Sequence, residues 1–288
     1  MKKLNKLLKT LIKNGELSLS VLDTTDLVNE AIKIHNLYPV CAAALGRTLT
    51  VCSFMSSNLK NQRDKLYVTI KGNGPIGKIT VCGNGNLEMR GSVDNPFLDI
   101  PLKPNGKLDV SGAVGKTGRL TIVRSMGLKE PYSGSSELVS GEIAEDFTSY
   151  YALSEQTPTA MALGVLIGTD GTCIGAGGVI MQLMPGASED TIKFVEEKIK
   201  EFKNISSLIK EKGANGVIKE YFGVEDYTEL YPKYHCLCDK DYVKGILVSL
   251  GKKELLDIIK KEGAVKVNCE FCKTEYAFSE KDVEDMFK

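Results

Sequence analysis

Four cysteines near the C-terminus carry the clearest chemistry in this sequence. Two stand at Cys236 and Cys238 and two at Cys269 and Cys272, with 30 residues between the pairs. Thiols separated by one or two residues can point to the same side of the chain, and two such pairs can surround one metal ion as a tetrahedron of sulfur ligands. The spacing therefore predicts one Zn²⁺ per chain, held by these four side chains.

The predicted zinc site can be purely structural or can act as a redox switch. Cysteines two or three positions apart can reach the Cα separation of a disulfide, so each pair can close on itself after oxidation. The ring from Cys236 to Cys238 would be small and easily reduced again, which favours a reversible switch. His235 adjoins this pair, but four thiolates already fill a tetrahedral site, so we expect this histidine outside the ligand set.

Two other functions fit four cysteines less well. A thiol oxidoreductase would use Cys269 and Cys272 in catalysis, but no helix N-terminus follows this pair to lower the pKa of a thiol. A zinc-dependent nucleic-acid or translation factor would need a basic zinc domain, whereas residues 231–288 contain 11 basic and 11 acidic side chains. The whole chain is balanced too, with 37 Lys and Arg against 37 Asp and Glu. We therefore expect no general affinity for nucleic acid or for an anionic membrane.

Residues 231–288 must form a small unit around the four thiols. Strands at Val265–Asn268 and Thr274–Phe278 would flank the second pair as a knuckle. Apolar residues at helical spacing predict two helices between the pairs, one with Val243, Ile246, Leu247 and Leu250 and one with Leu255, Ile258 and Ile259. A unit of this size buries little apolar surface, so the metal should supply much of its folding free energy, on the order of 10 kcal/mol in comparable peptides.

Charge density divides the rest of the chain. Residues 1–186 contain 35 charged side chains and residues 187–230 contain 17, about twice the density, directly after Pro185-Gly186. We therefore expect a core domain at 1–186, a charged helical linker at 187–230 and a zinc-binding domain at 231–288. The linker should be one helix over 188–213, followed by breaks at Asn215-Gly216 and Phe222-Gly223, with a single apolar stripe formed by Ile192, Val195, Ile199 and Phe202.

The predicted core domain mixes strands and helices that do not alternate one by one. Alternating apolar residues after Lys65, interrupted by glycine-rich turns, predict an antiparallel sheet. Helical patterns cover 26–36, 40–59 and 142–151, the last behind an N-cap at Ser140. An N-terminal helix is also expected, with one apolar stripe formed by Leu4, Leu7, Leu8, Leu11 and Ile12. This arrangement is typical of the α+β class rather than of a doubly wound sheet.

Three further features are assigned to structure or location. Single cysteines lie among apolar neighbours and are expected in the core: Cys41, Cys52, Cys82 and Cys173. The segment 114–117 resembles the end of a phosphate-binding loop, but Val110 replaces the required first glycine, so we expect a hairpin turn at Gly115–Gly118. Apolar runs are far shorter than the ~20 residues of a membrane-spanning helix. We expect no membrane segment and a cytoplasmic protein, in which the cysteines stay reduced.

Seven further segments add to the cysteine pattern: DTTDLV from Asp23, ALGRTLT from Ala44, KGNGPIGKI from Lys71, GLKEPYSG from Gly127, SGEIAEDF from Ser140, SEQTP from Ser154 and QLMPGA from Gln182. Together with the cysteines, they resemble the redox-regulated heat-shock chaperones of thirty-three kilodaltons, a bacterial holdase family. The similarity covers essentially the whole chain. It implies an ATP-independent chaperone rather than an enzyme, with a core domain, a metastable linker and a zinc switch.

The resemblance also implies how the switch operates. Oxidation by peroxide or hypochlorite, with heat, would join Cys236, Cys238, Cys269 and Cys272 in disulfides and release the zinc. Unfolding client proteins would then bind, and a homodimer would form.

Overall fold

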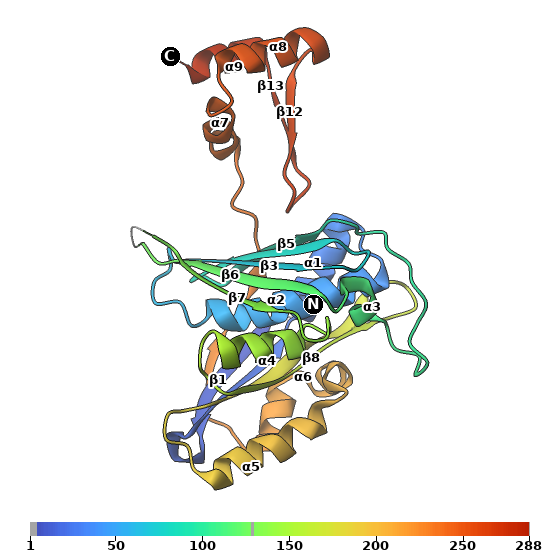
Figure 1. Cartoon of the computed structure of the whole chain (residues 1–288), viewed down its shortest axis with the longest axis vertical. Helices are drawn as coiled ribbons and strands as arrows, with labels where there is room; N and C mark the ends of the chain where they lie inside the picture. Colours follow the sequence, from blue (N-terminus) through green and yellow to red (C-terminus); the bar gives the residue numbers. More distant parts are fainter. Residues whose placement is uncertain (1–4, 128–129, 288) are drawn as a thin grey trace. The chain divides into compact units, whose positions relative to one another are not determined.

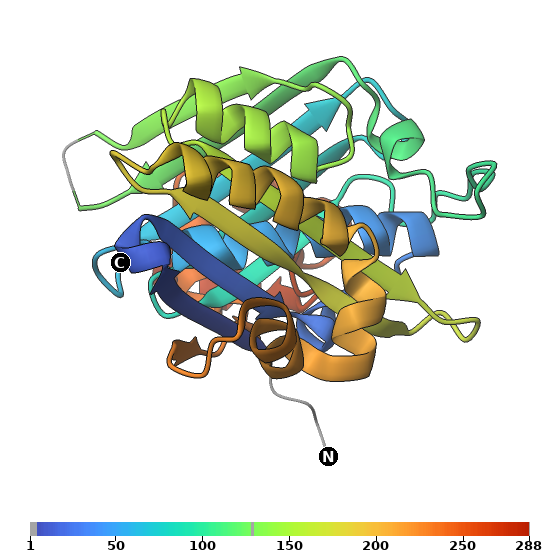
Figure 2. The same ribbon diagram turned by 90° about the horizontal axis from the view of Figure 1, so that it is seen from below.

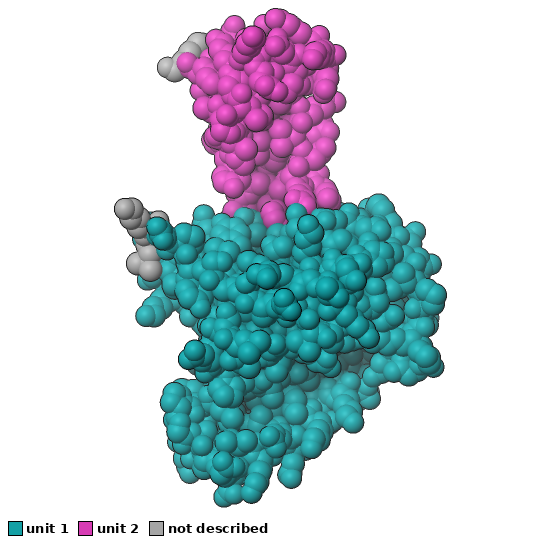
Figure 3. Space-filling view, viewed as in Figure 1, with its two compact units in different colours: residues 1–234 teal, residues 235–288 magenta. Residues whose placement is uncertain are grey.

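The computed structural model describes residues 5–127 and 130–287. The chain divides into two compact units, residues 1–234 (unit 1) and residues 235–288 (unit 2) (Figure 3). Both units combine helices with antiparallel strands, which confirms the predicted α+β class. The division into core, linker and switch domains is a functional one and stays a prediction.

Unit 1 combines strands and helices (Figure 1). Its strands are β1 (Lys6–Ile12), β2 (Leu17–Asp23), β3 (Lys65–Gly72), β4 (Lys78–Asn84), β5 (Glu88–Val93), β6 (Gly118–Ser125), β7 (Tyr132–Glu137), β8 (Thr159–Ile167), β9 (Cys173–Leu183), β10 (Thr228–Leu230) and β11 (Lys233–Tyr234). Its α-helices are α1 (Thr25–His35), α2 (Pro39–Ser56), α3 (Val110–Val114), α4 (Ala144–Leu153), α5 (Glu189–Lys198) and α6 (Ile205–Phe222). Two short 3₁₀ helices are η1 (Lys13–Gly15) and η2 (Ile199–Phe202).

Two sheets enclose helix α2. The five-stranded sheet has the order β10-β1-β2-β9-β8, and the six-stranded sheet has the order β11-β5-β4-β3-β6-β7. Helix α2 contacts strands of both sheets (Figure 1), while α6 packs on the opposite face of the five-stranded sheet together with α5 (Figure 2). Unit 1 therefore has two apolar cores, one around α2 and one beneath α5 and α6.

Helix α2 is the central core element, as its small and apolar residues predict. A Cβ atom on Gly46 would lie 2.9 Å from side-chain atoms of Val28 and Val165, so only glycine allows this close packing. By length and composition the helix could cross a bilayer, but 89% of its 18-residue window is buried inside the protein. Its hydropathy is that of a core helix.

The N-terminal helix prediction is wrong, because β1 occupies that segment and pairs with β2 over its whole length. Leu7 is buried in the core around α2, and Leu8 is buried in the core beneath α5 and α6. A strand covered on both faces needs apolar residues at successive positions, and such a run can also match a helical stripe. Leu4 lies outside the described residues.

The charged segment after Pro185 packs on unit 1 rather than standing apart as one helix. Helix α5 ends at Lys198, and α6 starts only at Ile205. The turn between them brings the ring of Phe202 to 5.3 Å from that of Tyr221 and 5.5 Å from that of Phe222, measured between ring centroids. The predicted single helix over 188–213 is therefore wrong, because burial of this aromatic cluster folds the chain back on itself.

The predicted breaks in this segment have different outcomes. The break near Asn215-Gly216 lies instead at Gly213, whose φ of 64° and ψ of 178° are not helical. The end at Phe222-Gly223 is confirmed, and Gly223 closes α6 in the left-handed conformation.

Two local predictions around α4 and β6 are also wrong. Residues Gly115–Gly118 do not form a hairpin turn, because they join the short helix α3 to β6. Helix α4 begins after Ile143, and Ser140 is not its N-cap. The fully buried Asp146 carboxylate instead accepts backbone N–H groups at 2.8–3.2 Å, from Val139, Ser140, Gly141 and Ile143.

We predict that Asp146→Ala lowers the free energy of unfolding by about 3 kcal/mol or more, because several buried N–H donors lose a charged acceptor. The midpoint of urea unfolding, followed by circular dichroism, measures the loss. Glu145→Ala is the matched control, since this neighbour on the same helix is exposed and should change stability by no more than about 0.5 kcal/mol. Equal midpoints for the two variants would contradict the prediction.

Candidate metal centre

The four paired cysteines come together in unit 2. This unit consists of α7 (Lys240–Val248), α8 (Lys252–Glu262), β12 (Val265–Asn268), β13 (Glu275–Phe278) and α9 (Glu280–Met286). Cys236 and Cys238 lie just before α7, while Cys269 and Cys272 lie in the turn between β12 and β13. The predicted knuckle is thus present, with Thr274 just outside the second strand.

Backbone hydrogen bonds shape both cysteine segments. In the turn, Cys269 N donates to Thr274 O, and Lys273 N donates to Cys269 O, each at 2.9 Å. Lys273 takes a positive φ of 58°, which lets the chain reverse directly after Cys272. In the other segment, the Asp239 carboxylate accepts the N–H of Tyr242 at 2.7 Å and starts α7 immediately after Cys238.

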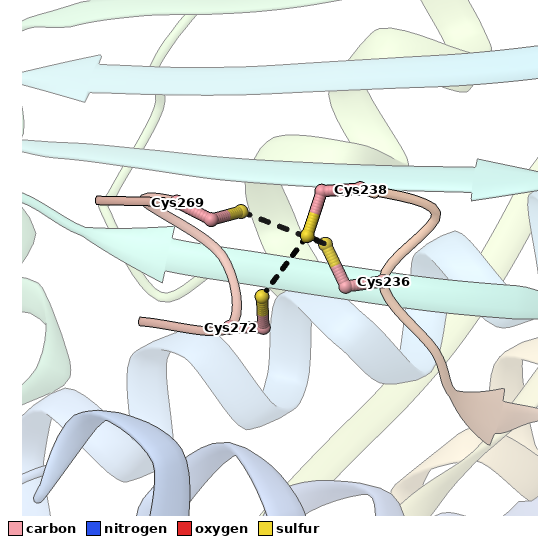
Figure 4. A group of neighbouring side chains, drawn as sticks. All are labelled: Cys236, Cys238, Cys269 and Cys272. Carbon is pink, nitrogen blue, oxygen red and sulfur yellow. Dashed lines mark hydrogen bonds between the residues drawn. The ribbon is translucent and has the colours of Figure 1, made fainter. Parts of the chain in front are cut away.

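The four sulfur atoms form one cluster (Figure 4). All of them lie within 4.8 Å of one another. Cys236 Sγ is 3.3 Å from Cys238 Sγ and 3.7 Å from Cys269 Sγ, and Cys238 Sγ is 3.2 Å from Cys272 Sγ. These distances are well above the ~2.05 Å of an S–S bond, so the thiols are unbridged and arranged around a common centre. The cluster could hold a metal ion.

Two side-chain hydroxyls, one on β13 and one just before it, contact the sulfur cluster. Tyr276 donates a hydrogen bond to Cys238 O at 3.1 Å, and its hydroxyl lies 3.3 Å from Cys238 Sγ. The Thr274 hydroxyl lies 3.2 Å from Cys272 Sγ. The spacing of the cysteines gives no indication of these two residues. Alternation along a strand places positions 274 and 276 on one face, beside Cys272, and this pattern could have identified them.

The surroundings shift the cysteine pKa values in different directions. Burial raises the pKa of Cys236 and of Cys238, and the hydrogen bond from Tyr276 opposes the shift at Cys238. Burial also disfavours the Cys272 thiolate, but hydrogen bonds with Thr274, Cys238 and Cys269 together outweigh it and lower the pKa of Cys272 to about 7. Four thiolates in one place repel each other, so a cation at their centre would favour the fully deprotonated cluster.

The apolar core of unit 2 is small. Its buried members are Val243, Leu247, Leu255, Val265, Phe278 and Val283. The two predicted helices are present as α7 and α8, but Ile246 and Leu250 are exposed rather than packed with Val243 and Leu247. A unit with so few buried side chains needs an additional cross-link to be stable, and the sulfur cluster is placed to provide one.

The remaining predicted residues lie outside the cluster. His235 is exposed, and it does not belong to the group of potential metal ligands. The single cysteines Cys41, Cys52, Cys82 and Cys173 are buried, as predicted. Burial raises the pKa of Cys41 and of Cys52, and it raises that of Cys173 to about 12. These three thiols therefore stay protonated and unreactive at neutral pH.

Fold and site together define a two-unit α+β protein with a four-thiol metal-type centre in its small C-terminal unit. The family model described as "Hsp33 protein" matches residues 5–279. Proteins named 33 kDa chaperonin are 42% identical in Desulforamulus reducens, over 98% of this chain and 97% of that protein, and 44% identical in Ruminiclostridium cellulolyticum, over 92% and 91%.

A solved structure agrees with these sequence matches. The crystal structure of the 33 kDa chaperonin (heat shock protein 33 homolog) of Thermotoga maritima has a TM-score of 0.90 to this chain. It is 34% identical, and the match covers 99% of this chain and 98% of that one. This chain belongs to the Hsp33 protein family, and that membership supports a chaperone function.

We predict that Tyr276→Phe weakens binding of a thiophilic metal ion by about tenfold, because removing a hydrogen-bond partner of a ligand typically costs that much affinity. Titration with Co²⁺, followed by thiolate-to-metal absorption, measures the change. Tyr242→Phe is the control, since this tyrosine of the same unit is exposed on α7. Equal Co²⁺ affinity of the two variants would show that the Tyr276 hydroxyl does not support the site.

Proposed function

We propose that this protein is a redox-regulated, ATP-independent chaperone that binds unfolding proteins under oxidative and heat stress. Its family supports a chaperone role, and the observation that carries the redox part is the cluster of four half-buried sulfur atoms in unit 2. The function requires no catalytic residue. A cytoplasmic location, where thiols are kept reduced, is part of the proposal.

The metal in the reduced state is proposed to be Zn²⁺, one per chain, bound by Cys236, Cys238, Cys269 and Cys272. A tetrahedron with Zn–S bonds of about 2.3 Å has sulfur atoms about 3.8 Å apart. Three of the S···S distances are 3.2–3.7 Å and all lie within 4.8 Å, which brackets this edge length. Four sulfur donors without a carboxylate also favour zinc over Mg²⁺ or Ca²⁺.

Oxidation would remove the ligands pairwise. Four thiolates give up four electrons to two molecules of peroxide, which take up four protons and leave as four water molecules. Two S–S bonds form in place of the metal–sulfur bonds. A disulfide within a pair joins cysteines two or three positions apart, whereas a disulfide between the pairs joins cysteines more than 30 positions apart. The shorter loops cost less entropy to close, which favours the disulfides Cys236–Cys238 and Cys269–Cys272.

Loss of the metal would then destabilise the linker, residues 187–230. Unit 2 has a small core, so it should unfold without its metal. Residues 187–230 are proposed to loosen in turn, because α5 and α6 depend on packing against unit 1 for their stability. Their apolar side chains, such as Val195 and Phe202, would become available to unfolding clients. Formation of a homodimer in the oxidised state is part of the same proposal.

One observation favours a second candidate, a thiol oxidoreductase. Hydrogen bonds with Thr274, Cys238 and Cys269 lower the pKa of Cys272 to about 7 against the effect of burial, and a partly ionised thiol beside a second cysteine can exchange disulfides. Reduction of insulin disulfides by this protein at a rate comparable to a thioredoxin would favour this candidate over a chaperone.

We predict that replacing any one of the four cysteines by Ser lowers the zinc content of the reduced protein from one per chain to well below one, because three thiolates leave the tetrahedron incomplete. Atomic absorption of the purified protein gives the content. His235→Ser is the matched control and should retain full zinc, since His235 lies outside the cluster. Full zinc in Cys272→Ser would refute the ligand set.

We predict that treatment with peroxide at mildly elevated temperature produces the two disulfides within the pairs. Digestion under non-reducing conditions and mass spectrometry identify the linked peptides. Bridges that mainly join Cys236 or Cys238 to Cys269 or Cys272 would contradict the pairing.

The proposed function is tested with thermally unfolding citrate synthase as the client. The peroxide-treated protein should suppress light scattering in the absence of ATP, and the reduced zinc-loaded protein should do so at least tenfold less per mole. If both forms are equally active or both inactive, redox regulation is wrong.

A further inference from the structure

The last residues of unit 1, 228–234, form the outermost strand at one edge of each sheet. Strand β10 is the outermost strand of the five-stranded sheet and pairs with β1 in antiparallel fashion. Strand β11 is the outermost strand of the six-stranded sheet and pairs with β5 in parallel fashion. Only Tyr231 and Pro232 separate β10 from β11, so one segment, residues 228–234, covers both edges. We call it the edge segment.

The edge segment pairs with each sheet over few residues. It pairs through three residues on β1 and two residues on β5, and each backbone hydrogen bond contributes only about 1 kcal/mol net. Ion pairs join Lys6 to Glu229 at 2.5 Å and Lys233 to Glu88 at 3.0 Å. Such partly exposed pairs contribute little. Leu230 and Tyr234 also pack against the core around α2, and Asn5 Nδ2 donates to Pro232 O at 3.0 Å, so these contacts must break before the segment can leave the sheets.

One tyrosine is the best-defined anchor. The Tyr234 hydroxyl donates to Gly91 O at 3.0 Å and accepts from Gly91 N at 3.3 Å, so it bonds both backbone groups of one β5 residue. It also lies 3.2 Å from His35 Nε2. Tyr234 stands two positions before Cys236, the first proposed metal ligand.

The two strands beneath the edge segment are held independently of it. Strand β1 pairs with β2 through seven residue pairs, and β5 pairs with β4 through four. Departure of residues 228–234 would leave both sheets intact, with β1 and β5 as open edges. An open edge presents unpaired N–H and C=O groups to any extended chain.

We propose that the edges of β1 and β5 are a client-binding surface, and that the edge segment occupies it in the resting protein. The partner is an extended segment of an unfolding polypeptide, which adds to the sheets as β10 and β11 do. This inference rests on the proposed function, in which oxidation loosens the linker that ends in this segment. It differs from binding on the apolar side chains of α5 and α6.

The chemistry of the edges suits unrelated clients. Backbone hydrogen bonding does not depend on sequence, so any extended chain can pair. The side chains add a moderate preference: Lys6 of β1 forms an ion pair with Glu229 of β10, and Leu7 pairs with Leu230, so segments that combine acidic and apolar residues should pair best. The charge of Lys6 also opposes edge-to-edge pairing between copies of this chain.

Hydrogen–deuterium exchange of the full-length protein tests the surface, with thermally unfolding citrate synthase as the client. Oxidation should speed exchange across residues 228–234 and in part of Lys6–Ile12 and Glu88–Val93. Addition of the client should then slow exchange in both strands by about tenfold or more, while the central strand β3 stays unchanged. A synthetic peptide of residues 226–234 should compete with the client, and the same peptide carrying Glu229→Pro should not, since proline removes an N–H group.

Variants test the edge segment without oxidation. Glu229→Pro disrupts β10, and Tyr234→Phe removes the anchoring hydroxyl while keeping the ring. Each reduced variant should bind the client several-fold more tightly than the reduced wild-type protein. Tyr67→Phe, on the central strand β3, is the matched control and should behave as wild type. If the Glu229→Pro variant does not fold, the Tyr234→Phe variant alone tests the proposal.

The outcomes separate this inference from the proposed function. Aggregation suppression by the oxidised protein without client-induced protection of β1 or β5 would overturn the edge surface and leave the chaperone function in place. Absence of suppression in every form would overturn both. Protection of both strands, together with competition by the 226–234 peptide, would support the edge surface.

Discussion

The structure of unit 2 depends on one constraint, the approach of the Cys236–Cys238 segment to the turn that carries Cys269 and Cys272. Six buried apolar side chains form its core, far fewer than a stable domain normally needs. The four sulfur atoms tie the start of the unit to its hairpin, and the Tyr276 hydroxyl adds a bond between the same two segments. The contacts between the two cysteine segments therefore add to a core that is small by itself.

Unit 1 is stabilised in a different way, by burial on both faces of the five-stranded sheet. Helix α2 fills the space between the two sheets, and α5 and α6 cover the outer face. The cysteines of this unit are buried singly, and burial holds the pKa values of Cys41, Cys52 and Cys173 above the ordinary range. The four clustered cysteines of unit 2 are only half-buried, so their thiols are more accessible than the single thiols of unit 1.

The segment from α5 to β11 combines two properties that rarely occur together. It is densely charged, yet it supplies Phe202, Ile205 and Ile209 to a core of unit 1 and an outer strand to each sheet. A polar segment that is ordered only by its neighbours is marginally stable. Whatever loosens it uncovers apolar side chains and strand edges together, which is the physical basis of the proposed chaperone activity.

The sequence by itself determined the features that depend on local spacing. Paired cysteines identified the cluster, the knuckle around the second pair predicted β12, alternation predicted β3, and small and apolar residues predicted α2. Tertiary structure decided the features that depend on contacts between residues far apart in the sequence. The leucines of residues 6–12 fit a helical stripe, but a sheet covered on both faces places Leu7 and Leu8 in different cores. The aromatic contacts of Phe202 broke the helix expected over 188–213, and Asp146 replaced Ser140 at the start of α4. Strands β10 and β11 are too short to show the alternation of apolar and polar residues that identifies a strand in a sequence. They are strands because they pair with β1 and β5, which are distant in the sequence.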